Sequence, residues 1–248
     1  MKTLTKMIAL SVSASAVLLA GGGTAPVEAD VAPVNDVNWQ IALKAGTLGL
    51  GVDVVRPIND RFAVRFNVNG LSVHDYEVDY TEYTDVDISG ATLLANVDLF
   101  TAGALLDWHP FRNGFLVSAG AYYNGNGASL VADVKDKVTY EGTEYTNDVI
   151  NSITSEVTFD NQFAPYFGIG YSNITESGWG FSWDIGAMYH GTPKVATTIN
   201  YGSGATDADK ADIEKSRIDA DKTANDSIAD YAIANFYPVI RVGIRYNF

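Results

Sequence analysis

The C-terminal end of the chain alternates apolar and polar side chains with a period of two from Phe236 to Phe248. The positions between the apolar ones include Arg241 and Arg245. Such an alternation predicts a strand with one apolar face. It recurs along the chain, so the sequence predicts eight strands, at residues 39–45, 48–54, 62–68, 100–108, 115–123, 163–171, 179–189 and 236–248.

The connections between these strands differ in length in a regular way. Residues 57–60, 110–114 and 173–178 are tight turns, whereas residues 74–90, 130–162 and 192–231 are long and polar. Only the link through Gly46, between the first two strands, is short where a long one is expected. An even number of strands, with short turns at one end and long loops at the other, is typical of a bacterial outer-membrane barrel.

Aromatic residues give a second indication, because amphipathic rings collect at membrane interfaces. If the short turns are periplasmic, one girdle contains Trp39, Phe62, Trp108, Phe115, Tyr171, Trp179, Tyr246 and Phe248, and the other contains Tyr123, Phe163, Tyr189 and Phe236. A soluble β-sandwich would alternate too, but it has no reason to gather rings at both strand ends. We therefore predict an all-β fold, an eight-stranded antiparallel transmembrane up-and-down β-barrel with long extracellular loops.

The first 29 residues are typical of a secretory signal peptide, with Lys2 and Lys6 ahead of an apolar run from Met7 to Gly22. We expect cleavage after Ala29, with Ala25 as the alternative, and a mature barrel over residues 30–248. The run is shorter than the roughly 20 residues that a transmembrane helix needs. The chain has no cysteine, which excludes a disulfide framework, a thiol nucleophile and a lipoprotein anchor.

The net charge of −14 excludes nucleic acid as the partner. The three long connections hold 21 acidic and 7 basic residues, so they carry the whole excess apart from one charge in the mature chain. The first of them is an acidic loop without a base, containing Asp75, Glu77, Asp79, Glu82, Asp85 and Asp87. A solvated surface explains such a run. The alternatives are that it attracts cations to the mouth, or that Ca²⁺ or Mg²⁺ binds loosely between these carboxylates and anionic lipopolysaccharide.

The inward positions of the strands carry charges of both signs. They predict a polar network in the lumen, made of Lys44, Asp53, Arg65, Asp107, Asp184, Arg241 and Arg245. Eight strands leave an interior that side chains fill, and an unpaired charge there costs several kcal/mol. We therefore expect the network to be a plug of ion pairs, in which the four bases outnumber the three acids.

Two features of the long connections predict local structure. Residues 206–229 contain neither proline nor glycine and begin with Thr206 and Asp207, so they predict a short helix. Residues 138–145 predict a hairpin that projects beyond the membrane. Asp207 with Asp209, and Asp219 with Asp221, are weak cation-binding patterns, and neither continues as an EF-hand loop, so no metal site is assigned.

The three histidines, His74, His109 and His190, give no catalytic arrangement with a serine and an acid. His190 with Ser182 or Asp184 is the best available set. We therefore expect no enzyme, no catalytic residue and no cofactor.

Three segments resemble the CarO-like eight-stranded outer-membrane proteins of Gram-negative bacteria: residues 163–171, residues 179–195 and the turn in residues 106–115. The resemblance implies a monomeric barrel that takes up small solutes, notably basic amino acids such as ornithine and, incidentally, carbapenems. It also implies that the outer-membrane assembly machinery reads the last strand, with Ile244, Tyr246 and Phe248 as the assembly signal.

The function predicted from the sequence is therefore that of a porin-like outer-membrane barrel in contact with lipid and lipopolysaccharide. It would admit small cationic or zwitterionic solutes past its acidic loops. Two alternatives remain open. One is a non-conducting structural or adhesive barrel, and the other is a lipid-modifying outer-membrane enzyme.

Overall fold

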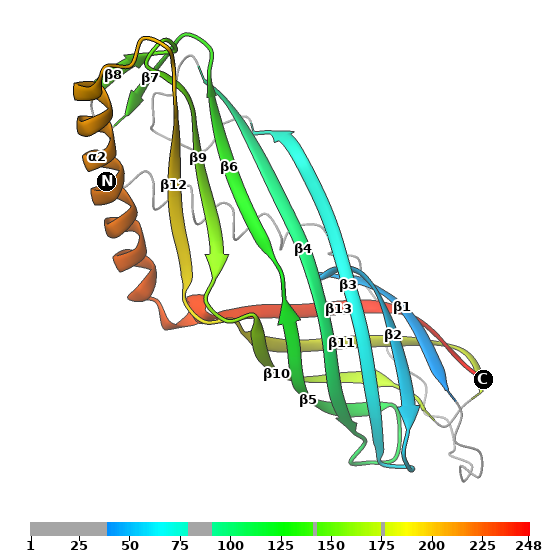
Figure 1. Ribbon diagram of the computed structural model, residues 1–248. Helices are drawn as coiled ribbons and strands as arrows, with labels where there is room; N and C mark the ends of the chain where they lie inside the picture. Colours follow the sequence, from blue (N-terminus) through cyan, green and yellow to red (C-terminus); the bar gives the residue numbers. More distant parts are fainter. Residues whose placement is uncertain (1–38, 79–90, 141–142, 175–176) are drawn as a thin grey trace.

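The computed structural model describes residues 39–78, 91–140, 143–174 and 177–248. The predicted signal peptide and its cleavage site lie outside these residues. Within them, eight antiparallel strands form a closed ring, in which each strand pairs with its neighbours along the chain and the last pairs with the first (Figure 1). These strands are β1 (Gln40–Gly46), β2 (Gly49–Pro57), β3 (Phe62–Glu77), β4 (Ala91–Trp108), β5 (Phe115–Asn124), β10 (Phe163–Ser172), β11 (Gly178–Tyr189) and β13 (Phe236–Asn247).

The ring closes between β1 and β13, where Gln40 faces Asn247 and Gly46 faces Arg241. Its eight strands are the eight that alternation predicts, and the fold class is confirmed. We call the end at which β1 begins and β13 ends the lower end of the barrel, and the opposite end the upper end. Several strand boundaries differ from the prediction: β3 continues to Glu77, β4 begins at Ala91, and β2 begins after Leu48. Leu48 lies in the tight turn before β2 and is fully buried, because Gly49 takes a positive φ of 88° and turns the chain back there.

Two strands continue well beyond the barrel. β3 and β4 are 16 and 18 residues long, and their upper halves continue the same sheet above the ring (Figure 1). The upper half of β4 pairs with β6 (Gly127–Val134), which pairs with β9 (Ile150–Phe159), which pairs with β12 (Pro193–Tyr201). The ranges 130–162 and 192–231, expected as polar loops, therefore contain much regular structure, and residues 74–77 of the range 74–90 belong to β3.

We call this upper part the platform: the upper halves of β3 and β4, with β6, β9 and β12, the hairpin of β7 (Lys137–Tyr140) and β8 (Thr143–Thr146), and the helix α2 (Asp207–Ala229). The predicted helix and hairpin are both confirmed. Thr206 and Asp209 form a capping box that fixes the start of α2. The platform has its own apolar core, made of Leu93, Val134, Val138, Ile150, Ile199 and Ile213.

Helix α2 lies along β12, the last strand of the extended sheet, and its side chains bond the backbone of that strand. Asn225 accepts from the Val195 N–H and donates to the Val195 carbonyl, at 2.8 and 2.9 Å. Asp221 accepts from the Thr197 N–H at 3.0 Å, and Arg217 donates to the Thr197 carbonyl at 3.2 Å. Four residues of helix rise about 6 Å and two residues of strand about 6.6 Å, so the two elements stay in step. The helix thus covers an edge that would otherwise offer free backbone groups to another strand.

Replacing both Asp221 and Asn225 with alanine should loosen α2 from β12. Each buried backbone group left without a partner costs about 1–3 kcal/mol, so the helix should detach before the barrel unfolds. We expect faster tryptic cleavage at Lys215 and Lys222, both exposed on α2, together with association of copies through the uncovered edge. Asp226→Ala, which removes only the exposed pair with Lys222, is the matched control and should leave both readouts unchanged. Equal cleavage rates in the double variant and the parent would show that these contacts do not hold the helix.

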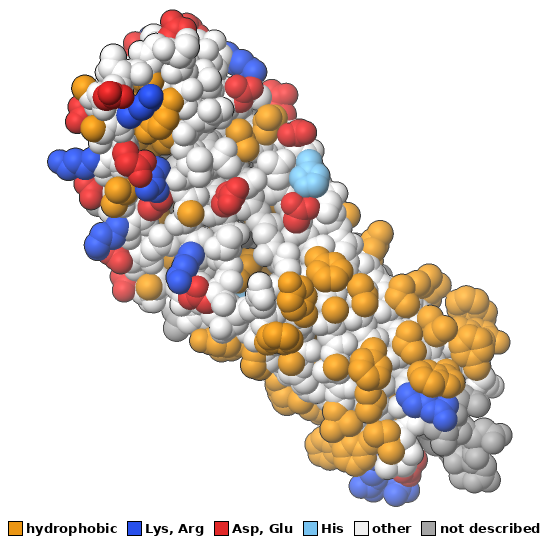
Figure 2. Space-filling view, viewed as in Figure 1, with side chains coloured by type: hydrophobic (Ala, Val, Ile, Leu, Met, Phe, Trp, Pro, Cys, Tyr) orange, Lys and Arg blue, Asp and Glu red, His pale blue; other side chains and the backbone are white. Residues whose placement is uncertain are grey.

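The outer wall of the barrel is apolar and its interior is polar, the reverse of a soluble β-protein. Outward side chains such as Phe167 (64% exposed), Phe66 (56%) and Ile185 (50%) cover the wall, and the face in Figure 2 shows hydrophobic side chains over the barrel and most of the charged ones over the platform. Aromatic rings of both predicted girdles face outward, among them Trp39, Trp108, Trp179, Phe163, Tyr189 and Phe236. Among the helices of the described residues, none is both long and apolar enough to cross a bilayer.

Candidate functional site

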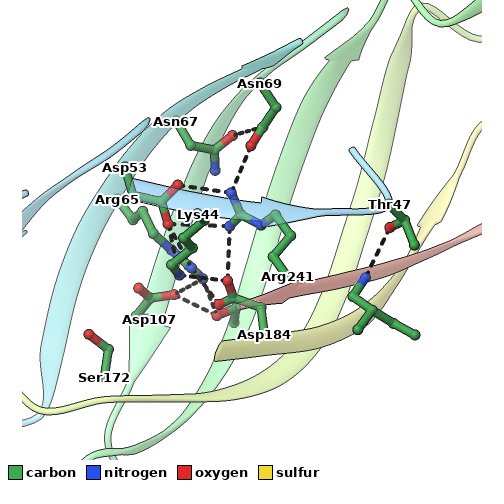
Figure 3. A network of polar contacts seen from close by, with 12 residues as sticks. Lys44, Thr47, Asp53, Arg65, Asn67, Asn69, Asp107, Ser172, Asp184 and Arg241 are labelled. Atoms are coloured by element: carbon green, nitrogen blue, oxygen red, sulfur yellow. Dashed lines mark hydrogen bonds and ion pairs between the residues drawn. The ribbon is translucent and has the colours of Figure 1, made fainter. Parts of the chain in front are cut away.

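Six charged side chains from six different strands meet inside the barrel, and we call them the lumen network (Figure 3). Each occupies an inward position of an alternating strand, so the period of the sheet alone points it into the lumen. None is more than 5% exposed. The lumen network consists of Lys44, Asp53, Arg65, Asp107, Asp184 and Arg241.

Asp184 contacts all three bases of the network. Its carboxylate oxygens lie 2.6 Å from Lys44 Nζ, 2.5 Å from Arg65 Nη1 and 3.0 Å from Arg241 Nη2. Asp53 contacts the same three bases, with 2.9 Å to Lys44 Nζ and 2.8 Å to Arg241 Nη1 as its shortest distances. The two carboxylates therefore join three strands of one wall to β11 and β13, and removal of either leaves buried cations underpaired.

Asp107 completes the network from β4. It accepts from Arg65 Nη2 at 2.9 Å and from the Ser118 hydroxyl at 2.5 Å, while Arg65 also donates to Ser118. The network has three bases and three acids, so it is neutral as a unit. Neutrality matters because charges in a dry interior are tolerated only when they are paired and hydrogen-bonded.

Arg245, the seventh predicted member, takes part in none of these seven ion pairs. It is buried, and its guanidinium lies over Gly180, where a Cβ would collide with it. The six groups that these ion pairs join are therefore balanced, and Arg245 lies apart from them along β13. Arg245 is four residues nearer the lower end of β13 than Arg241 is, a separation of about 13 Å along a strand.

Polar and apolar side chains fill the lumen on both sides of the network. Above it, Arg241 donates to Asn69, which in turn donates to Asn67 and to Thr101, and Asn67 donates to the Tyr122 hydroxyl. Beside these polar residues lies an apolar cluster of Leu48, Leu105, Tyr122, Ala164, Tyr166, Met188 and Val239. Below the network, Gln40 donates to Asn247 at 2.6 Å and accepts from Ser172 at 2.8 Å.

Sequence reasoning missed part of the apolar cluster. Alternation along β4 predicts that Leu105 and Thr101 face inward, because both lie an even number of residues from Asp107. Leu48 carried no such signal, because alternation assigns it to the outward face and only the turn at Gly49 points it inward.

The acidic loop is described only in part. Asp79, Glu82, Asp85 and Asp87 lie outside the described residues, whereas Asp75 and Glu77 are exposed on the upper half of β3. Asp75 takes a positive φ of 56° in a bulge, and its N–H donates to Asn96 at 2.8 Å. The described residues contain no group of three or more potential ligands that could hold a metal ion. Loose binding of Ca²⁺ or Mg²⁺ at this loop stays a prediction.

The three histidines lie on different parts of the fold. His74 is exposed and lies 3.1 Å from Asp98, and hydrogen bonds from Ser72 and then His74 lower the pKa of Asp98. His109 bonds the Asn113 carbonyl in a lower turn, at 3.0 Å. His190 packs on Phe159 at the upper end, and it lies about 20 Å along the strand from Asp184. His190 therefore does not meet Ser182 or Asp184, the partners that the sequence suggests for it.

Two residues of the predicted assembly signal, Ile244 and Tyr246, lie on the outward face of β13, and Phe248 directly follows the strand. Ile244 and Phe248 are 53% and 58% exposed, and Tyr246 packs between Trp179 and Phe248, with ring centroids 5.2 and 5.1 Å apart. The Phe248 N–H donates to the Trp39 carbonyl at 3.0 Å, which ties the end of the chain to the beginning of the barrel.

Deleting Phe248 should lower the amount of folded barrel in the outer membrane. The deletion removes an exposed ring at the end of the closing strand, while the lumen contacts stay intact. Folded protein is measured by the gel mobility of unheated membrane samples. Ile58→Ala, which truncates an exposed side chain in a lower turn, is the control. Equal folded fractions in the deletion variant and the parent would contradict a role of Phe248 in assembly.

Of the comparisons with known proteins, the one with solved structures finds similar chains. No protein-family model matches the sequence, and no curated protein matches it. Among solved structures, the chain is similar to CarO2 of Acinetobacter baumannii, with 24% identity, a TM-score of 0.53, and coverage of 86% of this chain and 99% of that one. It is also similar to CarO of the same organism, with 20% identity, a TM-score of 0.54, and coverage of 86% and 98%. The chain therefore has the CarO-like fold, as its sequence resemblance predicts, built as an eight-stranded β-barrel.

Proposed function

We propose that the protein is an outer-membrane β-barrel whose lumen is closed at rest and whose long strands hold the platform outside the cell. The apolar outer wall between two aromatic girdles supports the membrane location, because exposed side chains of this kind require lipid around them. The barrel would work as a monomer that contacts lipid and lipopolysaccharide after insertion by the assembly machinery. This proposal favours the structural or adhesive alternative over an open pore.

The lumen network carries the proposal of a closed lumen. Six paired charges that are at most 5% exposed lie across the barrel, and an apolar cluster lies in the same lumen. An ion crossing the barrel would have to replace several ion pairs at once, and breaking one buried pair costs about 3–5 kcal/mol. A permanent aqueous path needs lining groups that face water, and the members of the network face one another instead.

Recording from purified protein in planar bilayers tests this proposal. We expect long silent periods and no steady conductance in symmetric potassium chloride. Steady conductance with a preference for cations would overturn the closed lumen and favour the second candidate function.

The second candidate is porin-like passage of small cationic or zwitterionic solutes such as basic amino acids. The acidic excess of the long connections favours it, because 21 acids against 7 bases would concentrate cations at the mouth. Passage would then require the lumen network to rearrange, with a solute ammonium group competing with Lys44 for Asp53 and Asp184. Uptake of labelled lysine into proteoliposomes, compared with uptake of labelled glutamate, separates this candidate from a closed barrel.

A further inference from the structure

The link between α2 and β13 exposes large apolar side chains away from the barrel strands. It contains the short helix η3 (Ala232–Asn235), with Tyr231 just before it and Phe236 just after. Ile233 is 81% exposed, the largest fraction among the large hydrophobic residues that the structure describes, and Tyr231 is 65% exposed. Ile233 is not on a strand, so the alternation of the barrel wall does not account for its exposure.

Contacts on the opposite side of the link fix the direction of Ile233. Ala234 packs against the cluster of Val157, Val195 and Ile228, at the base of the platform. The backbone is held at both ends: the Tyr231 N–H donates to the Ile228 carbonyl at 3.0 Å, and the His190 N–H donates to the Asn235 carbonyl at 3.0 Å. The link is thus fastened to both α2 and the barrel, with its apolar side facing away from the protein.

The link continues a belt of rings at the upper end of the barrel. Five neighbouring strands of the ring each contribute one ring: Phe100, Tyr123, Phe163, Tyr189 and Phe236. Three of the four adjacent pairs are in ring contact, with centroids 6.2 Å apart for Phe100 and Tyr123, 6.1 Å for Tyr123 and Phe163, and 5.3 Å for Tyr189 and Phe236. Phe236 therefore joins the exposed side chains of the link to the membrane-facing wall.

Charged groups around the link indicate how deep it can lie. Asp230 is exposed immediately before Tyr231, and an exposed ion pair joins Lys194 to Asp160 at 2.7 Å at the base of the platform. These charges belong in water or among polar headgroups. An irregular backbone is also not tolerated in the hydrocarbon core unless protein covers it. The geometry therefore restricts the link to the interface, with only side chains reaching deeper.

We propose that residues 231–236 form a lipid anchor, in which Ile233 enters the acyl chains of the outer leaflet and Tyr231 places its hydroxyl among the headgroups. The anchor rests on the proposed membrane location. It would clamp the lower end of α2 to the bilayer, so that the helix covering the edge of β12 is held at both the platform and the membrane.

Site-directed spin labelling tests the anchor. Because the chain contains no cysteine, each single-cysteine variant has one labelling site. Nitroxides are attached at Ile233→Cys, at Phe167→Cys on the barrel wall and at Ile218→Cys on the outer side of α2, all in exposed positions. In phosphatidylcholine vesicles, collisions with oxygen and with a water-soluble nickel chelate are compared. Position 233 should favour oxygen, as position 167 does, and position 218 should favour nickel.

The outcomes separate the anchor from the membrane location. If position 167 favours oxygen and position 233 favours nickel, the anchor is wrong while the barrel still spans the bilayer. If both favour nickel, the membrane location fails and the anchor fails with it. Shielding of position 233 from both reagents would mean that protein covers the link, which also overturns the anchor. Gel mobility of unheated samples shows that each labelled variant is folded.

Discussion

Replacing Asp184 with asparagine should destabilise the barrel by about 3–5 kcal/mol, the usual cost of leaving a buried charge without its partner. The substitution keeps the size of the side chain but leaves Lys44, Arg65 and Arg241 with two carboxylates instead of three. The free energy of unfolding is measured by urea titration in vesicles, with tryptophan emission as the signal. The same variant should conduct more than the parent, with a preference for anions, because the lumen gains one net positive charge.

Asp160→Asn is the matched control for this prediction. Asp160 also pairs with a lysine, Lys194, but both side chains are largely exposed. Exposed pairs are worth roughly 0–1 kcal/mol, so the control should unfold almost like the parent. If the two variants lose the same small amount of stability, the lumen network is not a buried structural unit. If Asp184→Asn leaves a steady parental conductance unchanged, the lumen is an open pore.

An arginine in place of Ile185 should cost about 2–4 kcal/mol, as a charge on the lipid side of a barrel does at the bilayer midplane. Ile185 is 50% exposed near the middle of β11, between Ile169 and Ile240 on the neighbouring strands. In a water-soluble protein, a substitution at such an exposed position stays within about 0.5 kcal/mol. The same urea titration therefore measures whether lipid or water surrounds the barrel wall.

Ile218→Arg on α2 provides the comparison, since Ile218 is 51% exposed on the platform. We expect it to change stability by less than about 0.5 kcal/mol, the usual limit for surface positions. A large loss at position 185 with none at position 218 would place the bilayer around the barrel and below the platform. Equal, small effects at both positions would contradict the membrane location itself.

In the proposed closed barrel, the platform is the part that would act at the cell surface. Its apolar core, its capped helix and the covered edge of β12 make it a folded unit continuous with the barrel strands. Within α2, the hydrogen bond from Arg217 lowers the pKa of Glu214, so this pair keeps its charge at a lower pH than an isolated glutamate would. We propose this folded surface as the part that would contact an extracellular partner in the structural or adhesive alternative.

The barrel and the inward position of its charges followed from the sequence by itself. A period of two is a local property of a strand, so Ile240 and Arg241 must point to opposite faces whatever their surroundings. Once the apolar face is assigned to lipid, Lys44, Asp53, Arg65, Asp107, Asp184 and Arg241 can only point into the lumen. Helix α2 was predictable for the same reason, because its composition and its capping residues are local.

Only the tertiary structure decided which residues meet. Alternation does not say that Asp184 contacts three bases while Arg245 takes part in none of these ion pairs, since that depends on how far each strand is shifted along its neighbour. It also does not say that β4 exchanges its partner β5 for β6 above the barrel, or that α2 seals the edge of β12. Backbone hydrogen bonds are alike at every residue, so the choice of partner strand and register comes from packing between distant segments, which no local pattern records.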